Sequence, residues 1–123
     1  MTWRVGDARQ PVAEVGTDLV VVAYLHLPPT ELARALGHAA AALAPGGRAV
    51  VVGHDVRNLA EGTGGPQDPG VLTSPEPVRR ALEAGGLVVG VAEVARRPVP
   101  GAPRDALDTV VVAHRPGPSS QPE

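Results

Sequence analysis

The stretch TDLVVVAYLHLPPTELARALGHAAAALAPGGRAVVVGHD, from Thr17 to Asp55, holds two Val-rich runs on either side of a segment with helical periodicity. Continuous apolar runs of this kind are typical of strands that are buried on both faces, as in parallel sheets. Between the runs, Thr30 is a candidate N-cap, and apolar residues recur at helical spacing. We therefore expect a strand over 18–25, a helix over 31–43 and a strand over 48–53.

The rest of the chain adds elements on both sides of this unit. Ser74 and Pro75 form a cap-and-start signal for a second helix. The polar loop before them is longer than most connections in compact domains, and such loops are often functional. The other expected segments are a weak strand over 2–5, this polar loop over 54–73, strands over 87–95 and 106–114, and a tail over 116–123 with the composition of a disordered segment.

The order of these elements leaves one face of the sheet without a cover. Crossover connections between parallel strands are right-handed. If the sheet grows in one direction, both helices therefore lie on the same face. The opposite face of LVVVAYL and AVVVG is just as apolar, and nothing in this chain shields it from water. An exposed apolar face of that kind marks an interface or a liability to aggregate.

Composition bounds the class of protein. The chain has 123 residues, a one-domain length, and its net charge of −2 gives no general attraction to nucleic acid or anionic lipid. Without cysteine it has no disulfide framework, thiolate metal site or cysteine nucleophile. No apolar run approaches the roughly 20 residues that span a bilayer, and the first ten residues do not form a signal peptide. We expect a cytoplasmic protein that binds neither nucleic acid nor a membrane.

Several segments resemble the second half of a known family, the class I S-adenosylmethionine-dependent methyltransferases of Rossmann-like type. VGDAR resembles the family's third strand and turn, and DLVVVAYLHLPP its fourth strand and substrate-facing loop. LAPGGRAVVVGHD resembles the end of the following helix and the fifth strand. GLVVGVAEV and ALDTVVVAHR resemble its terminal antiparallel pair. The loop HDVRNLAEGTGGPQDP is similar to that of bacterial tellurite-resistance-type methyltransferases. The resemblance implies an α/β fold with a partial Rossmann-like sheet, in which parallel strands precede a C-terminal antiparallel pair and helices lie mainly on one face.

The sequence departs from the family in its front half. The family's glycine-rich loop follows its first strand, and an acidic residue ends its second strand; neither has a counterpart in this chain. EGTGG, residues 61–65, is no substitute, because it runs into PQDP where the motif demands a helix. We therefore expect residues 1–115 to be a truncated methyltransferase domain, produced by a start codon assigned too late or by a real truncation.

Polar residues are expected beyond the carboxyl ends of the strands, where ligands bind in open α/β sheets. By the resemblance, Asp7 accepts a hydrogen bond from the adenine amino group, and the N–H of Ala8 faces the ring. The alternative is an ordinary turn aspartate. Tyr24 and His26 match the loop beside the reactive methyl group. Tyr24 is a candidate cofactor contact, and both are candidate catalytic residues, with His26 as a base. The alternative is a core tyrosine and an ordinary loop histidine.

A third polar group follows the strand over 48–53. His54, Asp55 and Asn58 are candidate substrate-pocket residues. The His54–Asp55 pair also resembles a metal-binding dipeptide, but it ends a strand and the other histidines lack ligand spacing, so we expect no metal site. The segment AYLHLPP has no amide or acid to position a nitrogen nucleophile, which argues against a nucleobase amine as substrate.

Two functions follow from these observations. The first is methyl transfer from S-adenosylmethionine to an unidentified small molecule by the complete form of the protein, with this chain an inactive fragment. The second is a non-enzymatic interaction module that binds a partner, or a second copy as a homodimer, through the bare sheet face. A third and weaker option is an unrelated α/β module that binds nucleotides.

Overall fold

The structure is a computed structural model that describes residues 3–12 and 14–117. Its elements in chain order are β1 (Thr17–Ala23), α1 (Pro29–Ala41), β2 (Leu43–His54), α2 (Asn58–Glu61), a 3₁₀ helix (Pro69–Val71), α3 (Pro75–Ala84), β3 (Val88–Arg97) and β4 (Ala106–His114). None of the helices in the described ranges has the length and apolar character needed to cross a membrane.

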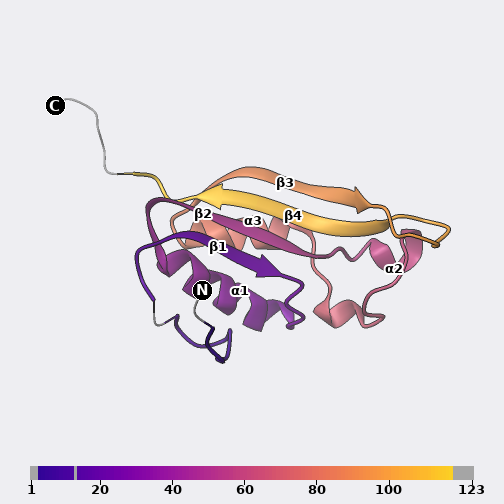
Figure 1. The fold of residues 1–123 in the computed structure, drawn as a ribbon, viewed down its shortest axis with the longest axis horizontal. Helices are drawn as coiled ribbons and strands as arrows, with labels where there is room; N and C mark the ends of the chain where they lie inside the picture. Colours follow the sequence, from indigo (N-terminus) through magenta and orange to yellow (C-terminus); the bar gives the residue numbers. More distant parts are fainter. Residues whose placement is uncertain (1–2, 13, 118–123) are drawn as a thin grey trace.

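The four described strands form one mixed sheet in the order β1-β2-β4-β3 (Figure 1). β1 and β2 are parallel, with Val21 opposite Val50. β4 lies between β2 and β3 and runs antiparallel to both, so β2 and β3 point the same way. The sequence prediction of parallel strands followed by a C-terminal antiparallel pair is confirmed.

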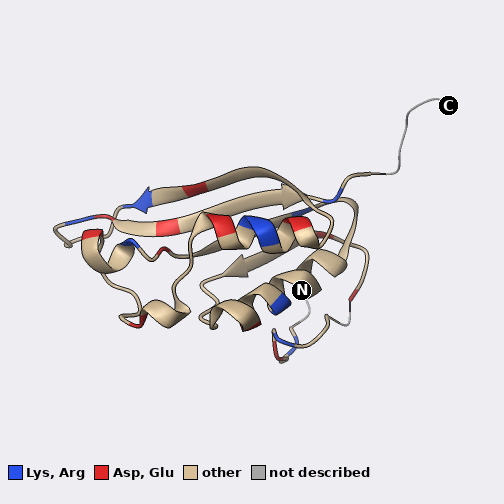
Figure 2. Cartoon of the chain, turned by 180° about the vertical axis from the view of Figure 1, so that it is seen from behind, with Lys and Arg blue, Asp and Glu red and all other residues tan. Residues whose placement is uncertain are grey.

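Both longer helices, α1 and α3, lie on the same face of the sheet, the face toward the viewer in Figure 2. Leu36 of α1 and Leu82 of α3 are 1% and 0% exposed, and they pack with Val51 of β2 and Val111 of β4. Because alternate residues of a strand point to opposite faces, each Val-rich strand contributes every second side chain to this core. The single-sided arrangement of helices predicted from the sequence is confirmed.

The other face of the sheet is not covered by any element of the described chain. On β1, Leu19 and Val21 are 58% and 57% exposed, whereas Val51 on the helix-covered side of β2 is 3% exposed. Val50 and Val52, which point to the open side of β2, are half-buried. The open face is therefore most exposed along β1, which is also an edge strand.

The strand expected over 2–5 is wrong for the part that the structure describes. Residues 3–5 are irregular, and the side chains of Trp3 and Val5 are exposed; Thr2 lies outside the described residues. A strand needs a neighbour that satisfies its backbone groups, and no strand of the described sheet pairs with this segment. Most of the tail expected over 116–123 also lies outside the described residues.

The boundaries of α1 and β2 differ from the expected ones. The N-cap of α1 is Pro28 and the helix begins at Pro29, because a proline in the first turn has no N–H to satisfy. Thr30 is therefore inside the helix and not its cap. β2 begins at Leu43, five residues before the strand expected over 48–53, so residues 44–47 are part of the strand. A Cβ on Gly47 would lie 2.9 Å from the carbonyl oxygen of Thr17, so glycine lets β1 begin close to β2.

Candidate functional site

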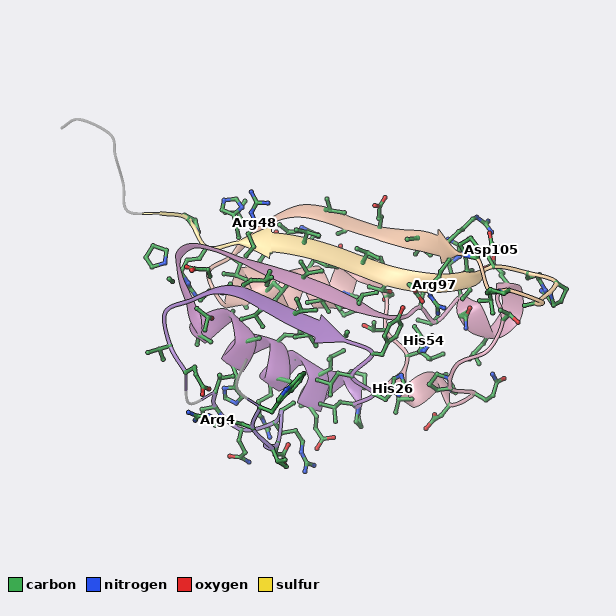
Figure 3. The ribbon with its side chains drawn as sticks, viewed as in Figure 1. Arg4, His26, Arg48, His54, Arg97 and Asp105 are labelled. Carbon is green, nitrogen blue, oxygen red and sulfur yellow. The ribbon has the colours of Figure 1, made fainter. Side chains whose placement is uncertain are left out.

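Polar side chains from four parts of the chain meet at one end of the sheet. Tyr24 follows β1, His54 ends β2, Arg97 ends β3, and Asp108 lies near the start of β4. Because β4 is antiparallel to its neighbours, its start lies beside their carboxyl ends, with Asp108 opposite His54. Figure 3 shows His54 and Arg97 at this end of the sheet and Arg48 at the other. We call Tyr24, His54, Arg97 and Asp108 the carboxyl-end cluster.

Asp108 is the centre of the carboxyl-end cluster. Its Oδ2 accepts hydrogen bonds from the hydroxyl of Tyr24 at 2.8 Å and from Nε of Arg97 at 2.9 Å. The Asp108 side chain is 5% exposed, and a carboxylate so buried is tolerated when it is paired and hydrogen-bonded. Its Oδ1 is buried and has no partner among the described residues. One oxygen of this carboxylate is therefore engaged twice, and the other is free.

His54 faces the free oxygen of Asp108. Its Nδ1 lies 3.9 Å from Asp108 Oδ1, which is too far for a hydrogen bond. Nδ1 is also buried and unpartnered within the described chain, although the His54 side chain as a whole is 14% exposed. Burial lowers the pKa of His54 below its ordinary value of 6.5, and the carboxylate of Asp108 opposes that effect. The imidazole is therefore mainly neutral at pH 7 and able to accept a proton.

A glycine-containing loop covers His54. A Cβ on Gly65 would lie 2.9 Å from His54 Nδ1, and the φ of Gly65 is +75°, so both the space and the backbone require glycine. Asn58 holds this loop, because its Nδ2 donates to the carbonyl of Gly64 at 2.9 Å and its Oδ1 accepts from the N–H of Leu107 in β4 at 2.8 Å. The contacts of Asn58 thus tie the loop to the sheet, and its predicted role in a substrate pocket stays a prediction.

Tyr24 lies in a bend that directly follows β1. Its φ is +53°, in the left-handed region that residues other than glycine seldom adopt. Its N–H donates to the carbonyl of Val52 at 2.7 Å, which holds it against β2. Its ring centroid lies 4.8 Å from that of His54. Burial, and then the hydrogen bond to Asp108, raises the pKa of Tyr24 above its ordinary value of 10.0, so the hydroxyl stays protonated and donates.

His26 lies on the exposed side of the cluster. Its ring centroid is 5.5 Å from that of His54, and the two histidines are neighbours in Figure 3. The structure therefore brings Tyr24 and His26, the two catalytic candidates, together with His54, a substrate-pocket candidate. Their roles stay predictions.

Asp55 has partners quite different from those of His54. Its Oδ1 accepts from the hydroxyl of Thr109 at 2.7 Å, and its Oδ2 accepts from the N–H of Arg57 at 2.8 Å. The residue is 1% exposed, and both carboxylate oxygens are engaged. These bonds join the end of β2 to β4 and to the following loop. Its predicted place in a substrate pocket stays a prediction.

Asp7 and Ala8 lie in the N-terminal segment. The carboxylate of Asp7 accepts from the backbone N–H of Arg9 at 2.9 Å and from its Nη2 at 2.8 Å, and Arg9 also reaches Glu31 in the first turn of α1. The bonds to Arg9 lower the pKa of Asp7 to about 2. Within residues 3–12 and 14–117, no hydrogen bond links Asp7 to the carboxyl-end cluster. The predicted adenine contact, which stays a prediction, requires Asp7 to share its oxygens with Arg9.

Asp108 and Arg97 were not among the site residues predicted from the sequence. The available signal was an aspartate within the mainly apolar strand ALDTVVVAH, because a charged residue is rarely buried without a partner. The partner could not be read from the sequence, since it depends on the placement of β4 between β2 and β3.

Solved structures resemble this fold. A SAM-dependent methyltransferase from Methanosarcina mazei matches with a TM-score of 0.67 and 14% identity, over 94% of this chain and 67% of that chain. The N-methyltransferase NodS from Bradyrhizobium japonicum matches with a TM-score of 0.64 and 22% identity, over 93% and 59%. The magnesium protoporphyrin IX methyltransferase of Synechocystis PCC 6803, with bound SAH, matches with a TM-score of 0.61 and 14% identity, over 89% and 49%. No family model matches the sequence, and no curated protein does.

These matches establish a class I methyltransferase-like fold, as the sequence resemblance implied. The chain spans 67%, 59% and 49% of the lengths of the three structures. All three neighbours are methyltransferases, and one of them holds bound SAH.

Proposed function

We propose, from the methyltransferase-like fold of this chain, that its complete form transfers a methyl group from S-adenosylmethionine to a small molecule. The observation that carries the proposal is the carboxyl-end cluster, which has buried polar atoms without partners in the described chain. It lies at the edge of the sheet where open α/β folds bind ligands. We propose Tyr24 and His26 as the residues that contact the reacting groups, with His54 beside them and with Asp55 and Asn58 supporting the substrate side.

The residues of this chain fit the reacting end of the cofactor better than its adenosine end. At the reacting end, Tyr24 presents an aromatic ring beside the unpartnered atoms of His54 and Asp108. At the adenosine end, Arg9 already occupies the carboxylate of Asp7, and the chain has no glycine-rich loop of the family type. We therefore propose Tyr24, Asp7 and Ala8 as a partial cofactor site, and we expect the 123 residues alone to be inactive.

The chemistry that the cofactor supplies is an electrophilic methyl group. The contribution of this chain is to hold the acceptor in line with that group, because positioning accounts for much of the acceleration of such displacements. Tyr24 is suited to this task, since three contacts fix it: the backbone bond to Val52, the hydroxyl bond to Asp108 and the ring of His54.

Titration calorimetry of the chain with S-adenosylmethionine tests the proposal. We expect weak, saturable binding. Asp7→Ala should weaken it about tenfold or more, because a hydrogen bond to a charged group contributes about 1.5–3 kcal/mol. Glu14→Ala is the matched control, since Glu14 is also an exposed carboxylate paired with an arginine of the same segment, Arg4. Equal effects of the two substitutions would contradict the adenine contact.

A second function is favoured by the exposure of Leu19 and Val21 on the open sheet face. On this alternative, the chain is an interaction module that binds a partner or a second copy through that face. No heat of binding with S-adenosylmethionine, together with a dimer that grows with protein concentration in sedimentation, would favour it. Saturable cofactor binding by a monomer would instead favour the methyltransferase.

A further inference from the structure

His54 and Asp108 form an incomplete pair. His54 Nδ1 and Asp108 Oδ1 are the buried side-chain polar atoms without a hydrogen-bond partner in the described ranges, and they face each other across 3.9 Å. Leaving such atoms unpaired costs about 1–3 kcal/mol each. Catalytic hydrogen bonds are often long in the absence of substrate and shorten when it binds. A movement of about 1 Å would turn this contact into a hydrogen bond of ordinary length.

We propose that His54 is a general base for a hydroxyl-bearing acceptor and that Asp108 positions it, an inference that rests on the proposed methyl transfer. When the contact closes, Nδ1–H donates to Asp108 Oδ1, and Nε2 is left with a lone pair. Because Nδ1 is buried while 14% of the side chain is exposed, the accessible part of the ring lies away from Nδ1. Nε2 is therefore the nitrogen that an acceptor reaches.

Asp108 is suited to a positioning role because its other oxygen is already fixed. The hydroxyl of Tyr24 and Nε of Arg97 both donate to Oδ2, so the carboxylate cannot turn without breaking two bonds. Such an arrangement selects one imidazole tautomer and stabilises the imidazolium that forms after proton transfer. The residues that face His54 are Tyr24 after β1, His26 in the following loop, Arg97 from β3 and Asp108 from β4.

With a hydroxyl acceptor, the bonds, the proton and the charge of the methyl transfer are all accounted for. The new bond joins the acceptor oxygen to the methyl carbon, the bond from that carbon to sulfur breaks, and its electron pair stays on sulfur. The hydroxyl proton goes to His54 Nε2, which takes up the positive charge that the sulfonium loses. Burial also keeps His54 neutral near pH 7, as a base must be before the step. A nucleobase amine is disfavoured as the acceptor, because AYLHLPP has no amide or acid to hold it.

Nitrogen NMR of the histidine side chains tests this inference without the cofactor. The chain has four histidines, so the signals can be assigned by single substitutions. At pH 7.5 we expect His54 to carry its proton on Nδ1. Phenol, as the hydroxyl probe, should shift the Nε2 signal saturably, whereas anisole, which has the same ring but no hydroxyl proton, should not. A proton mainly on Nε2, or equal responses to phenol and anisole, would overturn the proposal.

Asp108→Asn separates positioning from folding. We expect it to abolish the preference for the Nδ1–H tautomer, lower the pKa of His54 and weaken phenol binding at least tenfold. Asp105→Asn, three residues earlier, is the control and should leave all three unchanged. If Asp108→Asn does not fold, the tautomer and the phenol–anisole comparison in the unmodified chain still decide the matter. Failure of cofactor binding with a positive NMR result would remove the methyl transfer, and with it the base role of His54 in that transfer, and would leave only a site that binds a hydroxyl. Cofactor binding with a negative NMR result would remove only the role of His54.

Discussion

Two buried aspartates at the same end of the sheet differ in how their oxygens are used. Asp55 is 1% exposed, and each of its oxygens accepts one short hydrogen bond, from Thr109 and from the backbone of Arg57. Asp108 is 4% exposed, yet both of its hydrogen bonds go to Oδ2 and Oδ1 has none within the described chain. Burial is nearly equal, so it is the bonding that distinguishes the two residues.

This difference separates a structural carboxylate from a candidate functional one. Buried polar groups are nearly always satisfied, and an unsatisfied one in a native fold calls for an explanation, such as a ligand or a catalytic role. Asp55 has the pattern of a residue that holds β2, β4 and a loop together. Asp108 has one carboxylate oxygen that can still accept a hydrogen bond, and His54 faces that oxygen.

The largest expected effect concerns stability after removal of each carboxylate. Asp55→Ala leaves the buried hydroxyl of Thr109 and the N–H of Arg57 without partners, so the free energy of unfolding should fall by about 3 kcal/mol. Asp108→Ala removes one oxygen that is already unsatisfied and one that accepts from Tyr24 and Arg97. Of these two donors, which are only part-buried, Arg97 is 44% exposed and can turn to water. We expect a change within about 1 kcal/mol. Urea denaturation measures both, and equal losses would erase the distinction between the two aspartates.

A smaller effect is expected when each aspartate loses one hydroxyl donor and keeps its own charge. Thr109→Val leaves Asp55 Oδ1 without a donor in a fully buried place, and should cost about 1–2 kcal/mol. Tyr24→Phe leaves Asp108 Oδ2 with its second donor, Arg97, and should cost less than about 1 kcal/mol. The two substitutions are matched, because each removes one hydroxyl. Chemical denaturation measures both losses. If Tyr24→Phe lowered the free energy of unfolding more than Thr109→Val, the structural role would belong to Asp108 and the carboxyl-end cluster, not to Asp55.

The smallest expected effect is a dependence of stability on pH through His54. The pKa of His54 in the folded state is lowered below its ordinary value of 6.5. At pH values between the folded pKa and 6.5, the unfolded chain therefore binds more protons than the folded chain. Stability should therefore be lost as the pH falls below 6.5 toward the folded pKa.

Comparison of variants isolates this contribution of His54. The dependence of the denaturation midpoint on pH that comes from His54 should be absent in His54→Gln. It should remain in His114→Gln, which is altered at the exposed end of β4. An unchanged pH profile in His54→Gln would show that burial does not affect this group.

Much of the fold could be predicted from local pattern. The β4 prediction over 106–114 agrees with the structure at both ends, and α3 begins at Pro75 as its proline and preceding serine indicated. The prediction of a strand near residues 2–5 was wrong, because a short alternation of residue types does not form a stable strand unless a neighbouring strand pairs with it. The start of β2 was missed by five residues, since glycines and a proline that usually end an element were accommodated here within a strand.

The candidate site was predictable only in part. Tyr24, His26 and His54 were identified because they follow the ends of Val-rich strands, and such ends meet at one edge of a parallel sheet. Asp108 and Arg97 belong to an antiparallel pair far along the chain, so their approach depends on strand order and register. Asp55 and Asn58 were nominated for the same reason as His54, but their side chains make bonds that hold the loop and β4.

The sequence by itself determined the four strands and the two longer helices of the described chain, and that one apolar face of the sheet is left over, because the periods of apolar residues and the turn residues are local properties of the chain. Only the tertiary structure decided which polar residues are partners. The insertion of β4 between β2 and β3 places Asp108 against His54 and Tyr24 across 54 and 84 residues, and no local pattern encodes a distance of that kind.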